Sequence, residues 1–102
     1  MNHAEISIYP MGKGTSSSMY IARGVNAIKN MMGIKYEVTP MGTLIESENL
    51  EKIFEASKKI IDAVHDTGTQ RIETVLKIDS RYDKSYSLKE KLDSLKNHMT
   101  TI

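Results

Sequence analysis

The stretch Tyr36-Glu37-Val38-Thr39-Pro40-Met41-Gly42-Thr43-Leu44-Ile45-Glu46 decides the fold, because it predicts two neighbouring strands joined by a tight turn. Glycine adopts a positive φ without steric cost, so we expect Gly42 to shape that turn. The hydroxyl of Thr43 follows the turn directly, and the carboxylate of Glu46 comes three residues later. We expect side chains beside such a rigid turn to be well placed to hold a small polar ligand.

Upstream of this hairpin, the sequence predicts a strand, a loop and a helix. Apolar and polar side chains alternate over Ala4–Tyr9, which is typical of a strand with one buried face. The composition of Gly12–Ser18 is that of a loop, and one of its serines is expected to cap the following helix. Apolar residues at helical spacing predict that helix over Met19–Met32, with Gly24 inside it at a cost of about 1 kcal/mol relative to alanine.

The hairpin strands are expected over Ile34–Thr39 and Thr43–Ser47, and a fourth strand over Arg71–Asp79. Ser47 or Asn49 is expected to cap a second long helix between the third and fourth strands. That helix carries an apolar stripe with one serine in it, which we expect to be buried. The stripe consists of Leu50, Ile53, Phe54, Ser57, Ile60, Ile61 and Val64.

The chain is expected to finish with a short helix. Ser87-Leu88-Lys89-Glu90 has the pattern of a capping box, in which the serine and the glutamate satisfy each other's backbone N–H groups. Leu88, Leu92, Leu95 and Met99 then form a thin apolar stripe. Arg81 and Asp83, just upstream, are expected to pair locally and stabilise a turn.

The predicted order is therefore β-α-β-β-α-β with a short C-terminal helix, in a single domain over residues 1–102. Two parallel crossovers around a central hairpin are typical of the ferredoxin-like α+β sandwich. Right-handed connections put both long helices on one face of the sheet. The other face is polar, and two arrangements remain open: it is solvated, or it packs against the same face of a second copy and leaves a polar pocket, with Tyr9 and Val75 in contact.

Composition excludes several classes of function. The formal net charge of +1 over 102 residues does not point to nucleic acid or to an anionic membrane. The chain has no cysteine, which excludes disulfides, thiolate nucleophiles and thiolate metal sites. No apolar run is long enough to span a membrane and the first residues lack a signal-peptide pattern, so we expect a cytoplasmic location.

Five short motifs occur in a fixed order. They are Glu5-Ile6-Ser7-Ile8-x-Pro10-x-Gly12, Ser16-x-Ser18-x-Tyr20, Met41-Gly42-Thr43-x-Ile45-Glu46, Gly68-x-x-Arg71 and Lys77-Ile78-Asp79-x-Arg81-x-Asp83. In order and spacing the chain resembles the small thiamine-binding MTH1187/YkoF-like family, also called the UPF0045 group. The resemblance implies a ferredoxin-like subunit that assembles as a homodimer or homotetramer. It also implies binding of thiamine or of its hydroxymethylpyrimidine half, without catalysis.

The chemistry of thiamine indicates which side chains would bind it. A carboxylate can accept a hydrogen bond from the exocyclic amine and offset the cationic thiazolium, an aromatic ring can stack, and a hydroxyl can satisfy a ring nitrogen. We predict that Glu46→Gln weakens thiamine binding and leaves the fold intact. No catalytic residue, metal ligand or cofactor is expected. The candidate ligand-binding residues are Glu5, Ser7, Ser16, Ser18, Tyr20, Thr43, Glu46 and Arg71.

Most of these residues also have a purely structural explanation. Thr43 and Glu46 can serve the hairpin and the start of the following helix. Ser16–Ser18 can cap a helix, and capping and binding can coexist at a helix N-terminus. Glu5 can be a carboxylate on a solvated sheet face, and Arg71 can pair with a carboxylate of a second chain or bind a phosphate.

Functions of other classes fit less well. An acylphosphatase-like enzyme needs an arginine and an asparagine that the loop over residues 11–18 lacks. An RNA-recognition module needs exposed aromatic residues on a basic sheet, whereas the single phenylalanine, Phe54, is expected in the core. His3, His65 and His98 are too far apart in sequence to indicate a metal site. The main alternative is a structural or regulatory homo-oligomer with a different ligand or none.

Overall fold

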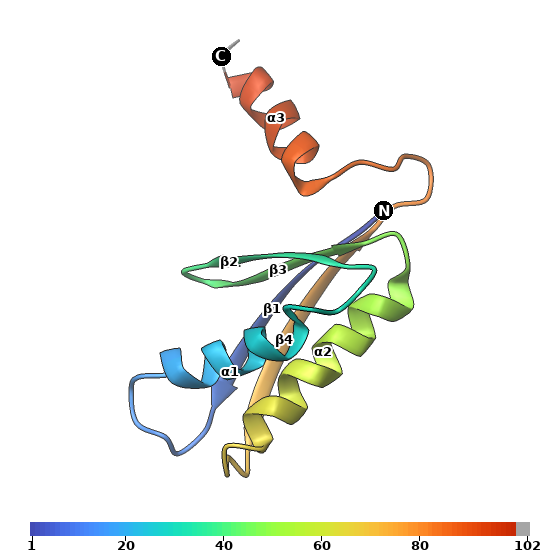
Figure 1. The fold of residues 1–102 in the computed structure, drawn as a ribbon. Helices are drawn as coiled ribbons and strands as arrows, with labels where there is room; N and C mark the ends of the chain where they lie inside the picture. The colour runs from blue at the N-terminus through green and yellow to red at the C-terminus, as the bar shows by residue number, and fades with distance from the viewer. Residues whose placement is uncertain (100–102) are drawn as a thin grey trace.

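The computed structural model describes residues 1–99 and confirms the ferredoxin-like α+β arrangement (Figure 1). The elements follow the predicted order, although several of their bounds differ by a few residues. They are β1 (Asn2–Pro10), α1 (Ser18–Ile28), β2 (Lys35–Thr39), β3 (Gly42–Ser47), α2 (Leu50–His65), β4 (Ile72–Ser80) and α3 (Leu88–Met99).

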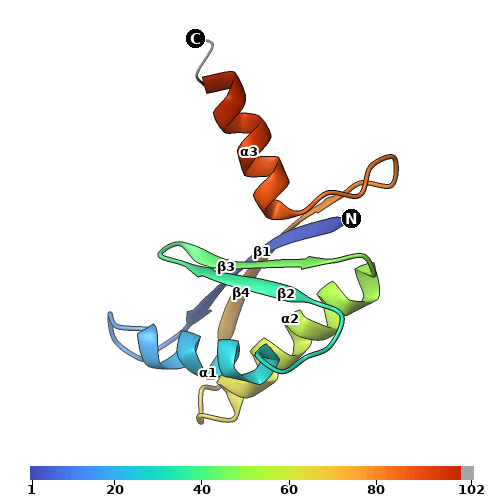
Figure 2. The same cartoon turned by 45° about the horizontal axis from the view of Figure 1, so that its top comes forward.

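The four strands form one sheet in the order β2-β3-β1-β4, and every neighbouring pair is antiparallel. Figures 1 and 2 show α1 and α2 together on one face of this sheet, as the right-handed connections require. β1 pairs with β4 over its whole length, but it pairs with β3 only from Asn2 to Ile6. The residues Ser7–Pro10 therefore have a partner strand on one side only.

The core lies between the sheet and the two helices. α1 lies close against α2 at Gly24, where a Cβ atom would lie 2.8 Å from Cγ2 of Ile60. The absence of a side chain there lets the helices pack, and this contact explains a glycine inside a helix. The buried apolar residues are Ala4, Ile6, Ile8, Ile28, Ile45, Ile53, Ala56, Ile60 and Val64.

The hairpin turn is built differently from the prediction. Gly42 is not among the glycines with positive φ, so it does not supply a left-handed turn conformation. The turn is held by Thr39, whose hydroxyl donates to the carbonyl of Gly42 at 2.7 Å and accepts from the backbone N–H of Gly42 at 3.1 Å. Gly42 instead permits close approach to β1, because a Cβ there would lie 3.0 Å from Ser7 Oγ and 3.2 Å from the backbone oxygen of Ile6.

Three further expectations are wrong in detail. α1 ends at Ile28 rather than Met32, because Ile28 is the last stripe residue to reach the core and Met32 is 84% exposed. Phe54 is 49% exposed, since it lies one residue beyond the core-facing position Ile53. Ser17 occupies the N-cap position of α1, but its side chain makes no capping hydrogen bond. Asn49 caps α2 as expected. At the start of α3 the Ser87 hydroxyl accepts from the backbone N–H of Glu90 as expected, whereas the Glu90 carboxylate accepts from the Ser87 hydroxyl and not from the Ser87 backbone, so half of the predicted capping box is present.

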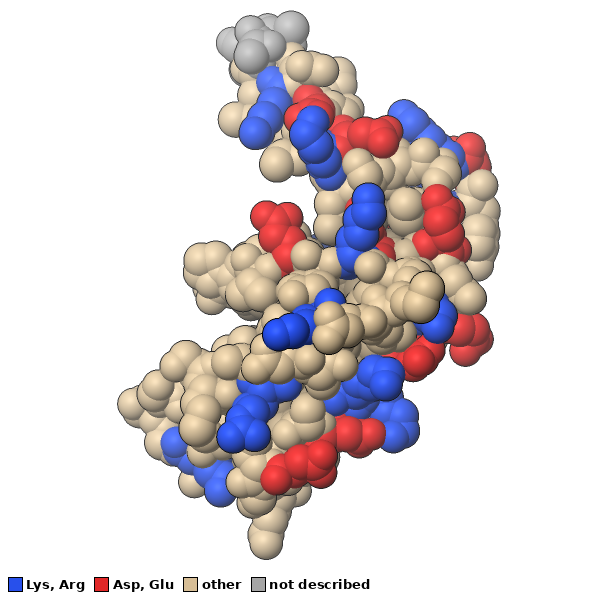
Figure 3. Space-filling model, in the orientation of Figure 1, with Lys and Arg blue, Asp and Glu red and all other residues tan. Residues whose placement is uncertain are grey.

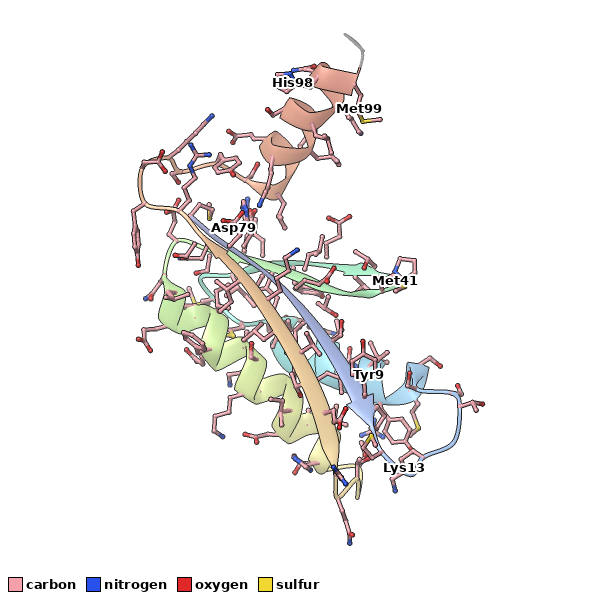
Figure 4. All side chains as sticks on the ribbon, turned by 180° about the vertical axis from the view of Figure 1, so that it is seen from behind. Tyr9, Lys13, Met41, Asp79, His98 and Met99 are labelled. Atoms are coloured by element: carbon pink, nitrogen blue, oxygen red, sulfur yellow. The ribbon has the colours of Figure 1, made fainter. Side chains whose placement is uncertain are left out.

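The helix α3 extends away from the body of the protein, with Met99 near its far end (Figures 1 and 4). The radius of gyration is 15.0 Å, compared with about 13 Å for a compact domain of this length. Figure 3 shows a hollow between α3 and the sheet. Leu92, Leu95 and Met99 on α3 are 49%, 57% and 62% exposed, so the apolar stripe of α3 lies largely uncovered.

Over residues 1–99, no helix has both the length and the apolar character needed to cross a membrane.

Candidate functional site

A cavity of about 220 Å³ lies where the hairpin turn, the end of β1 and the start of α1 meet. We call it the hairpin pocket. Figure 4 shows two of its lining residues, Met41 at the hairpin tip and Tyr9 near the end of β1. Because β3 begins only at Gly42, the last part of β1 has no partner strand on the β3 side, and this gap in the sheet leaves room for the cavity. Its walls are mostly apolar, formed by Ile6, Ile8, Ile21, Val25 and Ile60 together with the hairpin turn.

Several hydroxyl groups line the hairpin pocket, on Ser7, Tyr9, Ser17, Thr39 and Thr43. Ser7 on β1 donates a hydrogen bond to the carbonyl of Met41 at 3.1 Å, which ties the hairpin tip to β1. Thr43 is only 5% exposed, yet its hydroxyl has no hydrogen-bond partner among residues 1–99. The hydroxyl oxygen remains accessible from the cavity. Ser17 likewise keeps its hydroxyl free of a helix cap. The pocket thus offers unpaired hydroxyls within an apolar wall.

The other predicted residues near this pocket take more peripheral places. Cγ of Glu5 would lie 3.1 Å from a Cβ on Gly42, so the Glu5 side chain is adjacent to the pocket on the open face of the sheet. Ser16 and Ser18 flank Ser17 in sequence and are exposed. Sequence reasoning missed Ser17 itself, although its central position between the two predicted serines was a usable signal.

Two predicted residues lie outside the hairpin pocket. Tyr20 is half-buried and packs against the core from the first turn of α1. Arg71 is exposed just before β4, where its backbone carbonyl accepts from the N–H of Met11 at 2.9 Å. Neither side chain lines any of the cavities described here.

The structure also separates Thr43 from Glu46. Thr43 pairs with Ile6 and therefore faces the helices, whereas Glu46 pairs with His3 on the open face of the sheet. Two residues three apart on one strand must point in opposite directions, so they cannot serve one ligand as expected from the hairpin. Glu46 instead lines a second cavity of about 550 Å³ at the other end of β3, which we call the acidic pocket.

The carboxylate of Glu46 helps to hold α3 in place. It is 6% exposed, and its Oε2 atom accepts a hydrogen bond from the backbone N–H of Leu88 at 2.7 Å, at the first residue of α3. Negative charge at a helix N-terminus is favourable because of the unpaired N–H groups there. His3 Nε2 lies 3.5 Å from the same oxygen, within a side chain that is almost fully buried.

A second contact ties α3 to the end of β4. The ammonium of Lys91 donates to a carboxylate oxygen of Asp79 at 2.5 Å, beneath α3 in Figure 4. This hydrogen bond, reinforced by the charge of Lys91, holds the pKa of Asp79 below its ordinary value. The predicted pair of Arg81 and Asp83 is also present, at 2.6 and 3.1 Å, and it lowers the pKa of the Asp83 carboxyl.

No group of three or more histidine, cysteine, aspartate or glutamate residues within the described part of the chain could hold a metal ion. The expectation of no cofactor stays a prediction.

Comparison with known proteins assigns the family. Residues 4–96 match the family model described as "Thiamine-binding protein", which is nearly the whole chain. The chain belongs to the thiamine-binding protein family. A UPF0045 protein of Methanothermobacter thermautotrophicus is 42% identical over 94 residues, covering 91% of this chain and 94% of the relative. A UPF0045 protein of Bacillus subtilis, YqgV, is 36% identical, covering 94% of this chain and 95% of the relative.

Solved structures with the same architecture confirm the fold. A hypothetical protein from Methanocaldococcus jannaschii has a TM-score of 0.83 at 35% identity, with 92% of this chain and 94% of that chain covered. A structure described as a candidate thiamine biosynthesis/salvage protein from Thermotoga maritima has a TM-score of 0.74 at 24% identity, with 92% and 97% covered. The second likeness concerns the fold alone. The resemblance inferred from the five sequence motifs is thereby confirmed.

Proposed function

We propose that this protein binds thiamine or its hydroxymethylpyrimidine half in the hairpin pocket. The observation that carries the proposal is the pair of free hydroxyls, on Thr43 and Ser17, inside a mostly apolar cavity. An aminopyrimidine is a flat ring whose nitrogens accept and whose amine donates hydrogen bonds, so apolar walls with a few hydroxyls suit it. The family description supports the same class of ligand.

The size of the hairpin pocket favours one ring of thiamine over both. Cavities that enclose drug-sized ligands typically measure about 300–1,000 Å³, and this one measures about 220 Å³. The pyrimidine half therefore enters the pocket, and the cationic thiazolium stays at its mouth. Glu5, beside Gly42, is the nearest predicted carboxylate and offsets that positive charge.

The role we propose is binding without turnover. The hydroxyls of Ser7, Ser17 and Thr43 have no histidine or carboxylate among the residues that line the pocket, so none of them is paired with a general base there. A pocket of this kind suits delivery, storage or sensing of the ligand.

The test is a thermal-shift panel followed by calorimetry, at fixed protein concentration. The ligands are thiamine, its hydroxymethylpyrimidine half, its hydroxyethylthiazole half and sulfate. Ligand at 100 times its Kd should stabilise the fold by about 2.7 kcal/mol. We expect thiamine and the pyrimidine half to raise the midpoint, and the thiazole half and sulfate to leave it unchanged.

The variant Thr43→Val removes the hydroxyl and keeps the shape of the side chain. Loss of one neutral hydrogen bond should weaken pyrimidine binding about three- to tenfold. Thr74→Val is the matched control, because Thr74 faces the helices from β4 and does not line the pocket. No shift with any ligand would favour the alternative of a structural or regulatory oligomer. Weakening by Glu46→Gln, with Thr43→Val unaffected, would move thiamine to the acidic pocket.

We further propose that the protein forms a homo-oligomer through the open face of the sheet. A solvated face of an antiparallel sheet is normally polar, but here Tyr9 and Val75 are 51% and 58% exposed on that face. Leu88 and Lys91 of α3 line a small cavity together with the open-face residues Glu5 and Leu44, so the uncovered stripe of α3 starts on the same side. The open face of the sheet and α3 thus carry exposed apolar side chains among charged ones such as Glu5 and Lys77, and a second copy would cover these apolar side chains.

Sedimentation velocity of matched variants tests this association. Val75→Lys places a charge on the open face and should shift the protein towards monomer. Val38→Lys is the control, because Val38 is 56% exposed on the edge strand β2 but pairs with Thr43 on the opposite face. A wild-type protein that sediments as a monomer at micromolar concentration, or equal behaviour of both variants, would refute the proposal.

A further inference from the structure

The strand β4 forms one edge of the sheet, and its outer side has no neighbouring strand among residues 1–99. It is nine residues long, it contains no proline, and its pairing with β1 is continuous, without a bulge. Proteins normally protect such an edge, because its unpaired N–H and C=O groups can pair with another chain. An uninterrupted edge of this length can accept an additional strand.

The backbone hydrogen bonds indicate which groups of β4 face this edge. The carbonyl of Arg71 accepts from the N–H of Met11 at 2.9 Å, and the N–H of Arg81 donates to the carbonyl of Met1 at 3.1 Å. Hydrogen-bonded pairs alternate with non-hydrogen-bonded pairs along an antiparallel ladder. The odd-numbered residues between these two ends therefore bond to β1, and the even-numbered residues direct their N–H and C=O groups outwards. The outward-facing residues are Ile72, Thr74, Leu76 and Ile78.

The side chains that this segment presents on the open face have a self-complementary pattern of charge. In chain order they are Arg71, Glu73, Val75, Lys77 and Asp79, and all five are exposed. A second copy that runs antiparallel, with a two-fold axis at Val75, places its Asp79 opposite Arg71 and its Lys77 opposite Glu73. Every charge in this series then faces a charge of the opposite sign, which favours the pairing of two strands.

The two neighbouring registers do not match the charges. Moving the axis by one residue towards the N-terminus places Arg71 opposite Lys77, and moving it one residue the other way places Glu73 opposite Asp79. Like charges directly opposite each other are destabilising. Asp79 is already paired with Lys91, whereas Glu73 and Lys77 form no ion pair within residues 1–99. The pairs between Glu73 and Lys77 therefore contribute most to the complementarity.

The helix α2 presents apolar side chains near the same edge. Lys52 and Lys59 of α2 line a cavity together with the end of α1, so the helical period places Phe54 and Ile61 on the opposite flank of α2. Phe54 is 49% exposed and Ile61 is half-buried on that flank. Because α2 packs across β1 and β4, two copies joined through β4 would bring these flanks of their α2 helices together.

We infer that the outer edge of β4 is an interaction surface for a second copy of this chain. The second copy adds its own β4 antiparallel to the first about a two-fold axis at Val75, which joins the two sheets. This contact pairs the outward backbone groups and forms the pair between Glu73 and Lys77 twice. It uses a different surface from the open-face association proposed above, so either contact can exist without the other. The variant Val75→Lys affects both contacts and does not separate them.

Amide hydrogen exchange of ¹⁵N-labelled protein, followed by NMR, tests the backbone part of this contact. We expect the amides of Thr74 and Leu76 to exchange slowly in the wild type and to lose this protection in Glu73→Lys. Association through the open face adds no strand, so it leaves these edge amides unpaired. Exchange of Thr74 and Leu76 as fast as that of the outward amides of the edge strand β2 would overturn the inference.

Sedimentation equilibrium of charge variants tests the register. Glu73→Lys and Lys77→Glu each place like charges opposite one another twice, and each should raise the dimer Kd by about tenfold or more. The double variant E73K/K77E restores opposite charges and should return the Kd to within about threefold of the wild-type value. Glu37→Lys is the matched control, because Glu37 is an exposed carboxylate of the open face at the other edge of the sheet.

The pattern across these variants decides between the two surfaces. Weakening by each single variant with recovery in the double variant supports pairing through β4, because only directly opposed side chains exchange their charges in this way. Single variants with the wild-type Kd, a double variant that does not recover, or equal weakening by Glu37→Lys would overturn the inference.

Discussion

Gly42→Ala tests whether close approach, rather than backbone conformation, requires glycine at the hairpin. The new Cβ would lie 3.0 Å from Ser7 Oγ, 3.1 Å from Glu5 Cγ and 3.2 Å from the backbone oxygen of Ile6. The Ser7 hydroxyl can rotate away, but it then gives up its hydrogen bond to Met41. The backbone oxygen cannot move without disturbing the pairing of β1 with β3.

The expected cost of Gly42→Ala follows from these contacts. Overpacking costs about 1–3 kcal/mol and the lost hydrogen bond about 1 kcal/mol, against a gain of about 0.5–1 kcal/mol from replacing a flexible glycine in a strand. We therefore expect a net loss of about 1–3 kcal/mol in the free energy of unfolding. With an m-value of about 1–3 kcal/mol per molar urea, the midpoint should fall by about 1 M.

Urea unfolding at one fixed protein concentration measures this effect. Met41→Ala is the control at the same turn, because the Met41 side chain is 82% exposed and its backbone carbonyl is retained. Such a surface change should stay within about 0.5 kcal/mol of the wild type. A Gly42→Ala protein as stable as the wild type would refute the close-approach explanation.

Three further predictions concern stability. Gly24→Ala should lower the unfolding free energy by about 1 kcal/mol despite the better helix propensity of alanine, because its Cβ would meet Ile60; thermal unfolding checks this. Asn2→Ala should cost about 1–3 kcal/mol, since the buried Asn2 amide donates to a backbone carbonyl of β3 and accepts from a hydroxyl on β4; a gain in stability would contradict it. Because Lys91 lowers the pKa of Asp79, the stabilising contact between them should be complete above pH 3.8 and should be lost as the pH falls through the lowered pKa. NMR shifts of α3 should follow this loss in the wild type and should lack it in Asp79→Asn.

The order of elements could be predicted because most segments carry a clear periodicity. Alternation over β1 and the helical stripe around Ile53 and Val64 identify the buried faces correctly. The start of β1 was harder to predict, because Asn2 and His3 are buried although they are polar. Hydrogen bonds to the neighbouring strands hold Asn2, and His3 Nε2 lies 3.5 Å from a Glu46 oxygen. The end of α1 depended on whether Met32 would reach the core, which only the packing decides.

The candidate site was predictable in part. Ser7 and Thr43 lie in distant motifs, and the register of the sheet brings them to one cavity. The separation of Thr43 from Glu46 follows from strand geometry alone, so the alternation of side chains already contained that answer. The free hydroxyl of Ser17 and the oxygen of Glu46 without a hydrogen-bond partner could not be predicted. Whether a polar atom lacks a partner depends on the positions of all neighbouring donors and acceptors in the folded structure.

The extended helix α3 affects how this protein behaves in transport measurements. A body with extents of 48 × 30 × 19 Å experiences more friction than a sphere of the same 11.5 kDa mass. A single chain should therefore elute early from a size-exclusion column, at the position of a larger globular standard. An apparent mass above that of one chain is then no proof of association, and light scattering at the column outlet is needed to distinguish an elongated monomer from a dimer.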